Sequence, residues 1–347
     1  VMLITRPPFR PAAMVFGALL AGCQVNEEQA LAGPDAAGEA FPVLQAVAEA
    51  APVPSPNDAA DDAVVLVSQR GDAAFIAATD KQFGLLVYDL EGRQLAALGS
   101  GRLNNVDAIS VGEDEYLLAA SNRTTTAIEL FSALIRDGRI TVRAEGAVGL
   151  AVLEPYGLCM ANLDGDLSVF VGNRSGRIEE WRIDDEGFGT PGRVIVLPSR
   201  TEGCVVDAEG NRLFVGEEDV GIWSINLETL DPVLVDQVGE GRLIADVEGL
   251  DIYDNRYLVA SSQGSNSFAV YRLPGVDPVG VFRIGPNDEL GIDGVSETDG
   301  VAVSAASVTG YPQGILVVQD GYNVDPDENQ NFKIVDWREV ASLLDLR

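Results

Sequence analysis

Six short motifs recur along the chain, each with one polar residue, one small residue and then an apolar run. They start 45 to 51 residues apart and read Asp62-Ala63-Val64, Asp107-Ala108-Ile109, Tyr156-Gly157-Leu158, Glu202-Gly203-Cys204, Glu248-Gly249-Leu250 and Asp299-Gly300-Val301. Five of the six leading residues are carboxylates, which calcium and magnesium prefer as ligands. A lone Asp-Gly or Glu-Gly pair often only makes a turn, and phase alone could reflect a repeating architecture. Six motifs in phase favour a shared cation site.

A second row of polar residues follows the next apolar stretch of each repeat. It reads Thr79-Asp80-Lys81, Ser121-Asn122-Arg123, Gly172-Asn173-Arg174, Glu217-Glu218-Asp219, Ser262-Gln263-Gly264 and Gln319-Asp320-Gly321. Basic residues among carboxylates are typical of a site that holds metal ions and an anionic group together, such as phosphate bridged to calcium. The alternative for Lys81 and Arg123 is a solvated surface role.

The elements that must position both rows are short β-strands. From about Asp58 to the C-terminus, β-branched runs alternate with Gly, Asn and Asp turns. Six strand-rich periods of this length predict an all-β, six-bladed β-propeller with four-stranded antiparallel blades. The first row opens each innermost strand, and the second row closes the antiparallel strand after it. Both rows should therefore meet at one rim of the central channel.

Eight carboxylates at this rim are the candidate metal ligands. They are Asp62, Asp107, Glu202, Glu218, Asp246, Glu248, Asp293 and Asp299. Such crowded carboxylates repel one another strongly unless cations lie among them. Tyr156 replaces the carboxylate of the third motif, where the ring could pack structurally or the hydroxyl could bond a phosphate oxygen.

The composition excludes several classes of function. The 347 residues carry a net charge of −31 and include no histidine. This charge argues against nucleic acid and anionic membrane surfaces as partners, although it also serves solubility. Without histidine, neither a Ser-His-Asp triad nor a histidine-ligated zinc site can exist.

The N-terminus has the order of residues seen in a signal peptide. Arg6 and Arg10 precede an apolar run that ends in Leu20-Ala21-Gly22-Cys23. We expect residues 1–23 to be a lipoprotein-type signal with Cys23 lipidated; the alternative is an ordinary signal peptide that contains this cysteine. The anchor would place the protein in the bacterial cell envelope, at the periplasm or outer membrane, unless it is secreted.

The rest of the chain divides into two parts by composition. Residues 24–57 are rich in Ala, Glu, Pro and Gly, which predicts a flexible tether, and residues 58–347 form the propeller. Cys159 and Cys204 lie one residue out of phase in neighbouring repeats, so they should point to opposite faces of their strands. A disulfide is possible in an oxidising compartment, but this offset favours two buried free thiols.

Several stretches of the propeller region resemble the β-propeller phytases. They include Thr79-Asp80-Lys81, Gly101-Arg102-Leu103-Asn104-Asn105-Val106-Asp107, Ala120-Ser121-Asn122-Arg123, Tyr156-Gly157, Thr201-Glu202-Gly203, Glu217-Glu218-Asp219, Asp246-Val247-Glu248-Gly249-Leu250, Ser261-Ser262-Gln263-Gly264, Ser296-Glu297-Thr298-Asp299-Gly300 and Asn329-Gln330-Asn331-Phe332-Lys333. The resemblance covers residues 58 to 340 and extends over all six repeats.

The resemblance implies a calcium-dependent 3-phytase-type hydrolase that acts on phytate, with several calcium ions held by the eight carboxylates named above. It implies catalytic roles for Glu202, Glu218 and Glu248, and phosphate contacts from Lys81, Arg123 and Tyr156. Arg174 and Gln263 are further candidates for substrate binding. The expected reaction is attack on phosphorus by a metal-activated water, with phytate entering as its calcium complex.

Two departures from the family pattern affect the site. The family often has Gly-Lys-Glu where this chain has Gly172-Asn173-Arg174, and an arginine differs from a lysine in reach and geometry. The acid pair Asp61-Asp62 is kept without its usual proline and tryptophan, which leaves open which of the two binds metal.

Two other functions fit the same architecture. A calcium-dependent lactonase would need one buried metal and little basic charge, so Lys81 and Arg123 weigh against it. A non-catalytic lipoprotein scaffold would explain the tether and repeats but not the convergence of acids and bases. We expect a monomer, since no repeat has a long apolar edge.

Overall fold

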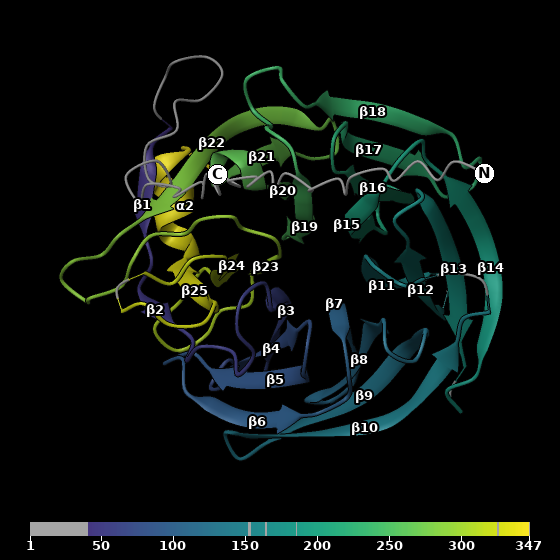
Figure 1. Ribbon diagram of the computed structural model, residues 1–347, viewed down its shortest axis with the longest axis horizontal. Helices are drawn as coiled ribbons and strands as arrows, with labels where there is room; N and C mark the ends of the chain where they lie inside the picture. The colour runs from purple at the N-terminus through teal and green to yellow at the C-terminus, as the bar shows by residue number, and fades with distance from the viewer. Residues whose placement is uncertain (1–40, 152–153, 164, 185, 325, 347) are drawn as a thin grey trace, which may run out of the picture. The chain divides into compact units, whose positions relative to one another are not determined.

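The computed structural model describes residues 41–151, 154–163, 165–184, 186–324 and 326–346, which fold into six β-sheets around a common centre (Figure 1). Within each sheet the consecutive strands pair antiparallel, and the innermost strands of the six sheets face one another. The prediction of a six-bladed β-propeller with four-stranded blades is confirmed.

Blades 1 to 3 each consist of four consecutive strands, ordered from the centre outward. Blade 1 contains β3 (Ala60–Val67), β4 (Ala74–Asp80), β5 (Gly84–Asp89) and β6 (Gln94–Leu98). Blade 2 contains β7 (Leu103–Gly112), β8 (Glu115–Asn122), β9 (Ala127–Arg136) and β10 (Arg139–Gly149). Blade 3 contains β11 (Leu158–Leu163), β12 (Asp166–Gly172), β13 (Arg177–Ile183) and β14 (Gly189–Val196).

Blades 4 to 6 continue the same pattern. Blade 4 contains β15 (Thr201–Asp207), β16 (Arg212–Glu217), β17 (Gly221–Asn226) and β18 (Pro232–Gln237). Blade 5 contains β19 (Val247–Tyr253), β20 (Tyr257–Ser262), β21 (Ser267–Arg272) and β22 (Asp277–Gly285), with the short 3-10 helix η1 (Gln263–Ser265) after β20. Blade 6 contains β23 (Val301–Ser304), β24 (Ile315–Asp320) and β25 (Asn331–Asp336), followed by α2 (Trp337–Leu343). Among the described residues, no helix is both long and apolar enough to cross a membrane.

The outermost strand of blade 6 comes from the other end of the chain. β2 (Ala48–Glu49) pairs antiparallel with β25, and β1 (Val43–Gln45) adds a parallel strand to β22 of blade 5. Leu44 and Ala46 of this segment are buried in the core between blades 5 and 6. Pairing the first and last segments in one sheet closes the ring.

This closure corrects the predicted tether. Residues 41–57 belong to the propeller, because small apolar side chains at the right spacing bury well even in an Ala- and Pro-rich segment. The average composition of residues 24–57 concealed that spacing. Residues 24–40 and the predicted signal with Cys23 lie outside the described residues.

Cys159 and Cys204 form a disulfide with a Cα–Cα distance of 5.6 Å, so the prediction of free thiols was wrong. The two cysteines lie on β11 and β15, in the buried core between blades 3 and 4. Neighbouring blades stack the back of one sheet on the front of the next. Side chains on opposite faces of adjacent inner strands therefore meet, and the one-residue offset favours the bond.

Candidate active site

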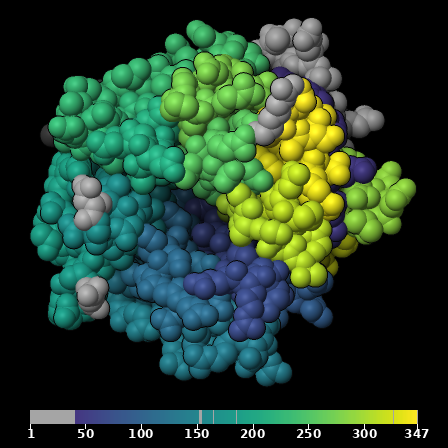
Figure 2. Space-filling view, turned by 180° about the vertical axis from the view of Figure 1, so that it is seen from behind, coloured from purple at the N-terminus to yellow at the C-terminus, as the bar shows by residue number. Residues whose placement is uncertain are grey.

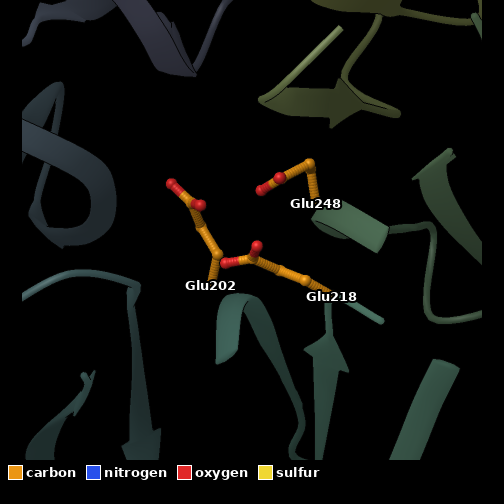
Figure 3. Close-up of side chains that lie close together, drawn as sticks. All are labelled: Glu202, Glu218 and Glu248. Carbon is orange, nitrogen blue, oxygen red and sulfur yellow. The ribbon is translucent and has the colours of Figure 1, made fainter. Parts of the chain in front are cut away.

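Three buried glutamates converge at one rim of the propeller (Figure 3). Glu202 lies in β15, Glu218 directly follows β16 and Glu248 lies in β19. One carboxylate oxygen from each side chain lies within 4.8 Å of the other two. A single divalent cation could contact all three carboxylates at this spacing. We refer to these residues as the three-glutamate cluster.

β-Bulges aim two of these side chains, those of Glu202 and Glu248. The register of β15 with β16 shifts between Thr201 and Cys204, and that of β19 with β20 shifts between Val247 and Leu250. Each bulge lies at the acidic residue of its motif, and a bulge re-aims the side chains around it. The strict alternation of a flat strand therefore does not hold where the site is built.

The glycine of each motif lets the inner strands approach one another. A Cβ atom on Gly203 would lie 2.0 Å from the carbonyl oxygen of Glu248, and one on Gly157 would lie 1.8 Å from that of Glu202. The amide of Gly249 also donates to the carbonyl of Asp299 at 3.0 Å. The small residue of the repeated motif thus brings the acid of the next blade close, which gathers the carboxylates.

The crowding leaves these carboxylates poorly compensated. Burial raises the pKa of Glu218 to about 8, with repulsion from Glu202 adding to the effect. Burial, followed by the charge of Glu202, also raises the pKa of Glu248 well above its usual value. Both shifts mean that the ionised cluster needs a positive charge that the surrounding protein supplies only in part.

Unpartnered oxygens show that the cluster fits a metal ion. Glu248 Oε2, Glu218 Oε1 and Asp61 Oδ2 are buried without a hydrogen-bond partner among the described residues. A buried carboxylate oxygen without a donor is costly, and a hard cation would satisfy it. The oxygen-only donor set suits calcium or magnesium better than zinc or copper.

Lys81 forms the basic side of the rim on blade 1. Its Nζ lies 2.5 Å from Asp58, 3.1 Å from Asp61 and 2.9 Å from Asp299. Burial alone would lower the pKa of Lys81, but attraction to these three carboxylates outweighs it and raises the pKa above the ordinary value. Lys81 is therefore a fixed positive charge inside an acidic site.

Asp299 and Gln263 lie beside Lys81. Gln263 donates from Nε2 to Asp299 Oδ1 at 2.6 Å, while the other carboxylate oxygen of Asp299 accepts from Lys81. Burial raises the pKa of Asp299 to about 6, and the charge of Lys81 opposes this rise. The structure thus brings together Lys81, Gln263 and Asp299 as the sequence predicted.

Two arginines lie over the ring of Tyr156. The guanidinium carbon of Arg174 lies 4.7 Å from the centre of its ring, and that of Arg123 lies 5.6 Å from it. Burial, followed by the charges of Glu202 and Glu248, raises the pKa of the Tyr156 hydroxyl. The hydroxyl therefore keeps its proton and can donate to an anionic oxygen.

Arg123 connects to the three-glutamate cluster through one neighbour. Its Nη1 donates to Asn104 Oδ1 at 3.2 Å, and Asn104 Nδ2 donates to Glu202 Oε1 at 2.6 Å. Asn104 is fully buried in β7. Arg123 therefore contacts the Tyr156 ring directly and Glu202 through Asn104, and it does not line the cavity into which the site opens.

The site opens into a cavity of about 670 Å³. Its charged and tyrosine lining includes Asp58, Lys81, Tyr156, Arg174, Arg200, Glu202, Asp246, Glu248, Glu297, Asp299, Asp327 and Glu328. The cavity volume lies within the range of small-molecule sites, and its walls carry both signs of charge. One face of the propeller is hollowed at its centre in the space-filling view (Figure 2).

Asp62 and Asp107 do not line this cavity but a separate small space among the innermost strands. Asp62 Oδ2 accepts from Asn105 Nδ2 and the amide of Val106, at 3.1 and 3.2 Å. Asp107 accepts from the amides of Ala108 and Met160, at 2.7 and 2.8 Å. These bonds tie each inner strand to the next one, a role that differs from the metal binding predicted for both residues.

Asp293 lies in a separate buried ion-pair group. Lys333 Nζ pairs with Asp293 Oδ1, with Glu49 at 2.5 Å and with Asp320 at 3.3 Å. The second oxygen of Asp293 accepts from the amide of Val324 at 2.7 Å. Asp293 thus helps Lys333 to hold β2 against β25, rather than joining the cavity.

The sequence left open whether Asp61 or Asp62 belongs to the site, and it did not single out Asp58 or Arg200. Asp61, rather than its neighbour Asp62, faces Lys81, because the bulge between Ala60 and Ala63 breaks the alternation of β3. Asp58 and Arg200 precede the motifs by a few residues, and their proximity to the motifs was the available signal.

Comparison with known proteins agrees with the motifs. The chain matches the protein family described as Phytase over residues 16–347. It is 37% identical to the 3-phytase of Bacillus subtilis (strain 168) over 321 residues. This match covers 85% of this chain and 84% of that relative. The resemblance found in the sequence is confirmed: the chain belongs to the phytase family.

Proposed function

We propose that this protein is a calcium-dependent phosphomonoester hydrolase that releases phosphate from phytate, myo-inositol hexakisphosphate. The observation that carries the proposal is the three-glutamate cluster of a phytase-family chain, whose Glu202 and Glu248 line the same cavity as Lys81 and Arg174. Phytate carries many phosphates, so it suits a site where negative protein groups are bridged by cations and positive groups remain for direct contact.

The three-glutamate cluster would hold calcium, with Asp246, Asp299 and Asp61 near enough to contribute to further ions. A bound calcium would neutralise phosphate charge and lower the pKa of the attacking water. The bulges and the close approach of β15 and β19 fix the backbones of Glu202 and Glu248. Their carboxylates would therefore be held in position for the cation.

The basic and hydroxyl groups would bind the phosphate that is cleaved. Lys81 supplies a fixed positive charge and Tyr156 a hydroxyl that stays protonated, and both line the same cavity. Arg174, exposed over the Tyr156 ring, can reach an incoming phosphate. Charge that builds on the phosphoryl oxygens during hydrolysis would be stabilised by these groups.

A phosphate-release assay with phytate tests the proposal. Wild-type protein treated with a chelator should release no phosphate, and added calcium should restore the release. Activity that a chelator leaves unchanged would overturn the metal mechanism. Calcium-dependent hydrolysis of a lactone without phosphate release would identify a lactonase, and calcium binding without either reaction would identify a scaffold.

A further inference from the structure

Arg200 contacts the three-glutamate cluster directly, although no sequence motif assigned it a role. It precedes β15 by one residue, and its Nη2 pairs with Glu218 Oε2 and lies 3.3 Å from Asp246 Oδ2. Its side chain is 38% exposed and lines the cavity with Tyr156 and Arg174. Arg200 thus joins a buried member of the cluster to the open space where substrate would lie.

Asn173, the residue before Arg174, contributes no positive charge to the cavity. Asn173 Oδ1 accepts from the amides of Ser175 and Arg177, both at 3.0 Å, so its side chain closes its own turn. Asn173 is not part of the cavity wall. On blades 3 and 4, the basic groups that line the cavity are therefore Arg174 and Arg200.

A cation held by the three glutamates would compete with Arg200 for Glu218. The two positive charges would share one carboxylate, so occupation by a divalent ion weakens the hold on the guanidinium. Arg200 would then be a tethered guanidinium at the cavity wall, and its planar donors match the oxygens of a phosphate.

We propose that Arg200 is a tethered counter-cation that pairs with Glu218 in the metal-free protein and binds a substrate phosphate once a divalent cation holds Glu218. This inference rests on the proposed function, since it assumes both the metal and the phosphorylated substrate. It makes two binding events interdependent, because metal binding releases the group that then binds phosphate. By linkage, phosphate should in turn strengthen the binding of metal.

Arg200→Gln tests the two halves of the inference separately. Without the competing charge, the variant should bind its first calcium about fivefold more tightly in calorimetric titration without substrate. With calcium present, its KM for phytate should rise about fivefold or more, while kcat changes less. Arg212→Gln is the matched control, because Arg212 pairs with Asp207 at the opposite end of β16 and should change neither quantity.

Arg200→Lys serves as a second variant in case loss of the charge impairs folding. It keeps the positive charge but lacks the planar fork, so its calcium affinity should stay near wild type while its KM rises. Unchanged calcium affinity and KM in Arg200→Gln would overturn the inference. If the wild-type protein itself neither binds calcium nor hydrolyses phytate, the proposed function fails first, which the wild-type arm reveals.

Discussion

At the scale of single residues, the partner of each carboxylate separates the acids of the site from those of the framework. Asp62 and Asp107 accept hydrogen bonds from backbone amides of the next blade. Glu248 and Asp61 instead leave a buried oxygen without a donor at the rim. Carboxylates at the leading position of the motif thus link neighbouring strands in blades 1 and 2, whereas Glu248 of blade 5 can bind a cation.

Replacing Glu248 with Gln should reduce phytate turnover about a hundredfold or more, because the cluster loses one anionic ligand. Phosphate release at saturating calcium measures this, with circular dichroism to check the fold. The matched control is Asp251→Asn, since Asp251 lies in the same strand and accepts from the amides of Ile252 and Val303. Turnover in the Gln variant close to wild type would remove Glu248 from the site.

Replacing Lys81 with Ala should destabilise the metal-free protein by about 3 kcal/mol, because Asp61 and Asp299 lose the charge that compensates their burial. Calcium should recover part of this loss by supplying positive charge to the same carboxylates. Urea unfolding with a chelator and with calcium measures both effects. A variant as stable as wild type in chelator would show that Lys81 does not compensate the buried charges of Asp61 and Asp299.

At the scale of elements, the repeat predicted where strands begin and end but not how their side chains point. The second row indeed closes β4, β8, β12, β16, β20 and β24. The bulges at the first row, however, change the alternation locally, which is why Asp61 was not preferred over Asp62. A bulge depends on contacts between strands, so a single sequence does not reveal it.

The disulfide between β11 and β15 should stabilise the propeller by about 4 kcal/mol, the loop-closure value for a sequence separation of 45 residues. The double variant Cys159→Ala and Cys204→Ala should unfold at lower urea concentration than the wild type. Reductant should destabilise only the wild type. Equal unfolding midpoints would mean that the bond contributes nothing.

At the scale of the whole propeller, the number of blades was predicted correctly from the period, whereas Asp62, Asp107 and Asp293 lie away from the rim site where the period had placed them. The contribution of β1 and β2 was not predicted, because ring closure pairs them with strands about 240 and 285 residues away in the sequence. The ion pair of Lys333 with Glu49 could not be predicted for the same reason, since it exists only once the ring is closed. Contacts made by closure are invisible to reasoning within one repeat.

The stability of the metal-free protein should fall as pH rises from about 5 to 9. Burial raises the pKa of Asp251 to about 7 and that of Glu218 to about 8, so the folded state binds more protons than the unfolded state in this range. Melting temperatures in chelator should therefore decrease with pH. With calcium the decrease should be shallower, because ionised Glu218 gains a partner; a melting temperature that rises with pH in chelator would contradict these shifts.

The most direct test of the central claim is calorimetric titration of calcium into the wild type and into a Glu218→Gln, Glu248→Gln double variant, both without substrate. We predict that the wild type binds calcium and that the double variant loses the tightest binding event while staying folded. Equal calcium binding by the two proteins would contradict the account, because the three-glutamate cluster would then not be the metal site.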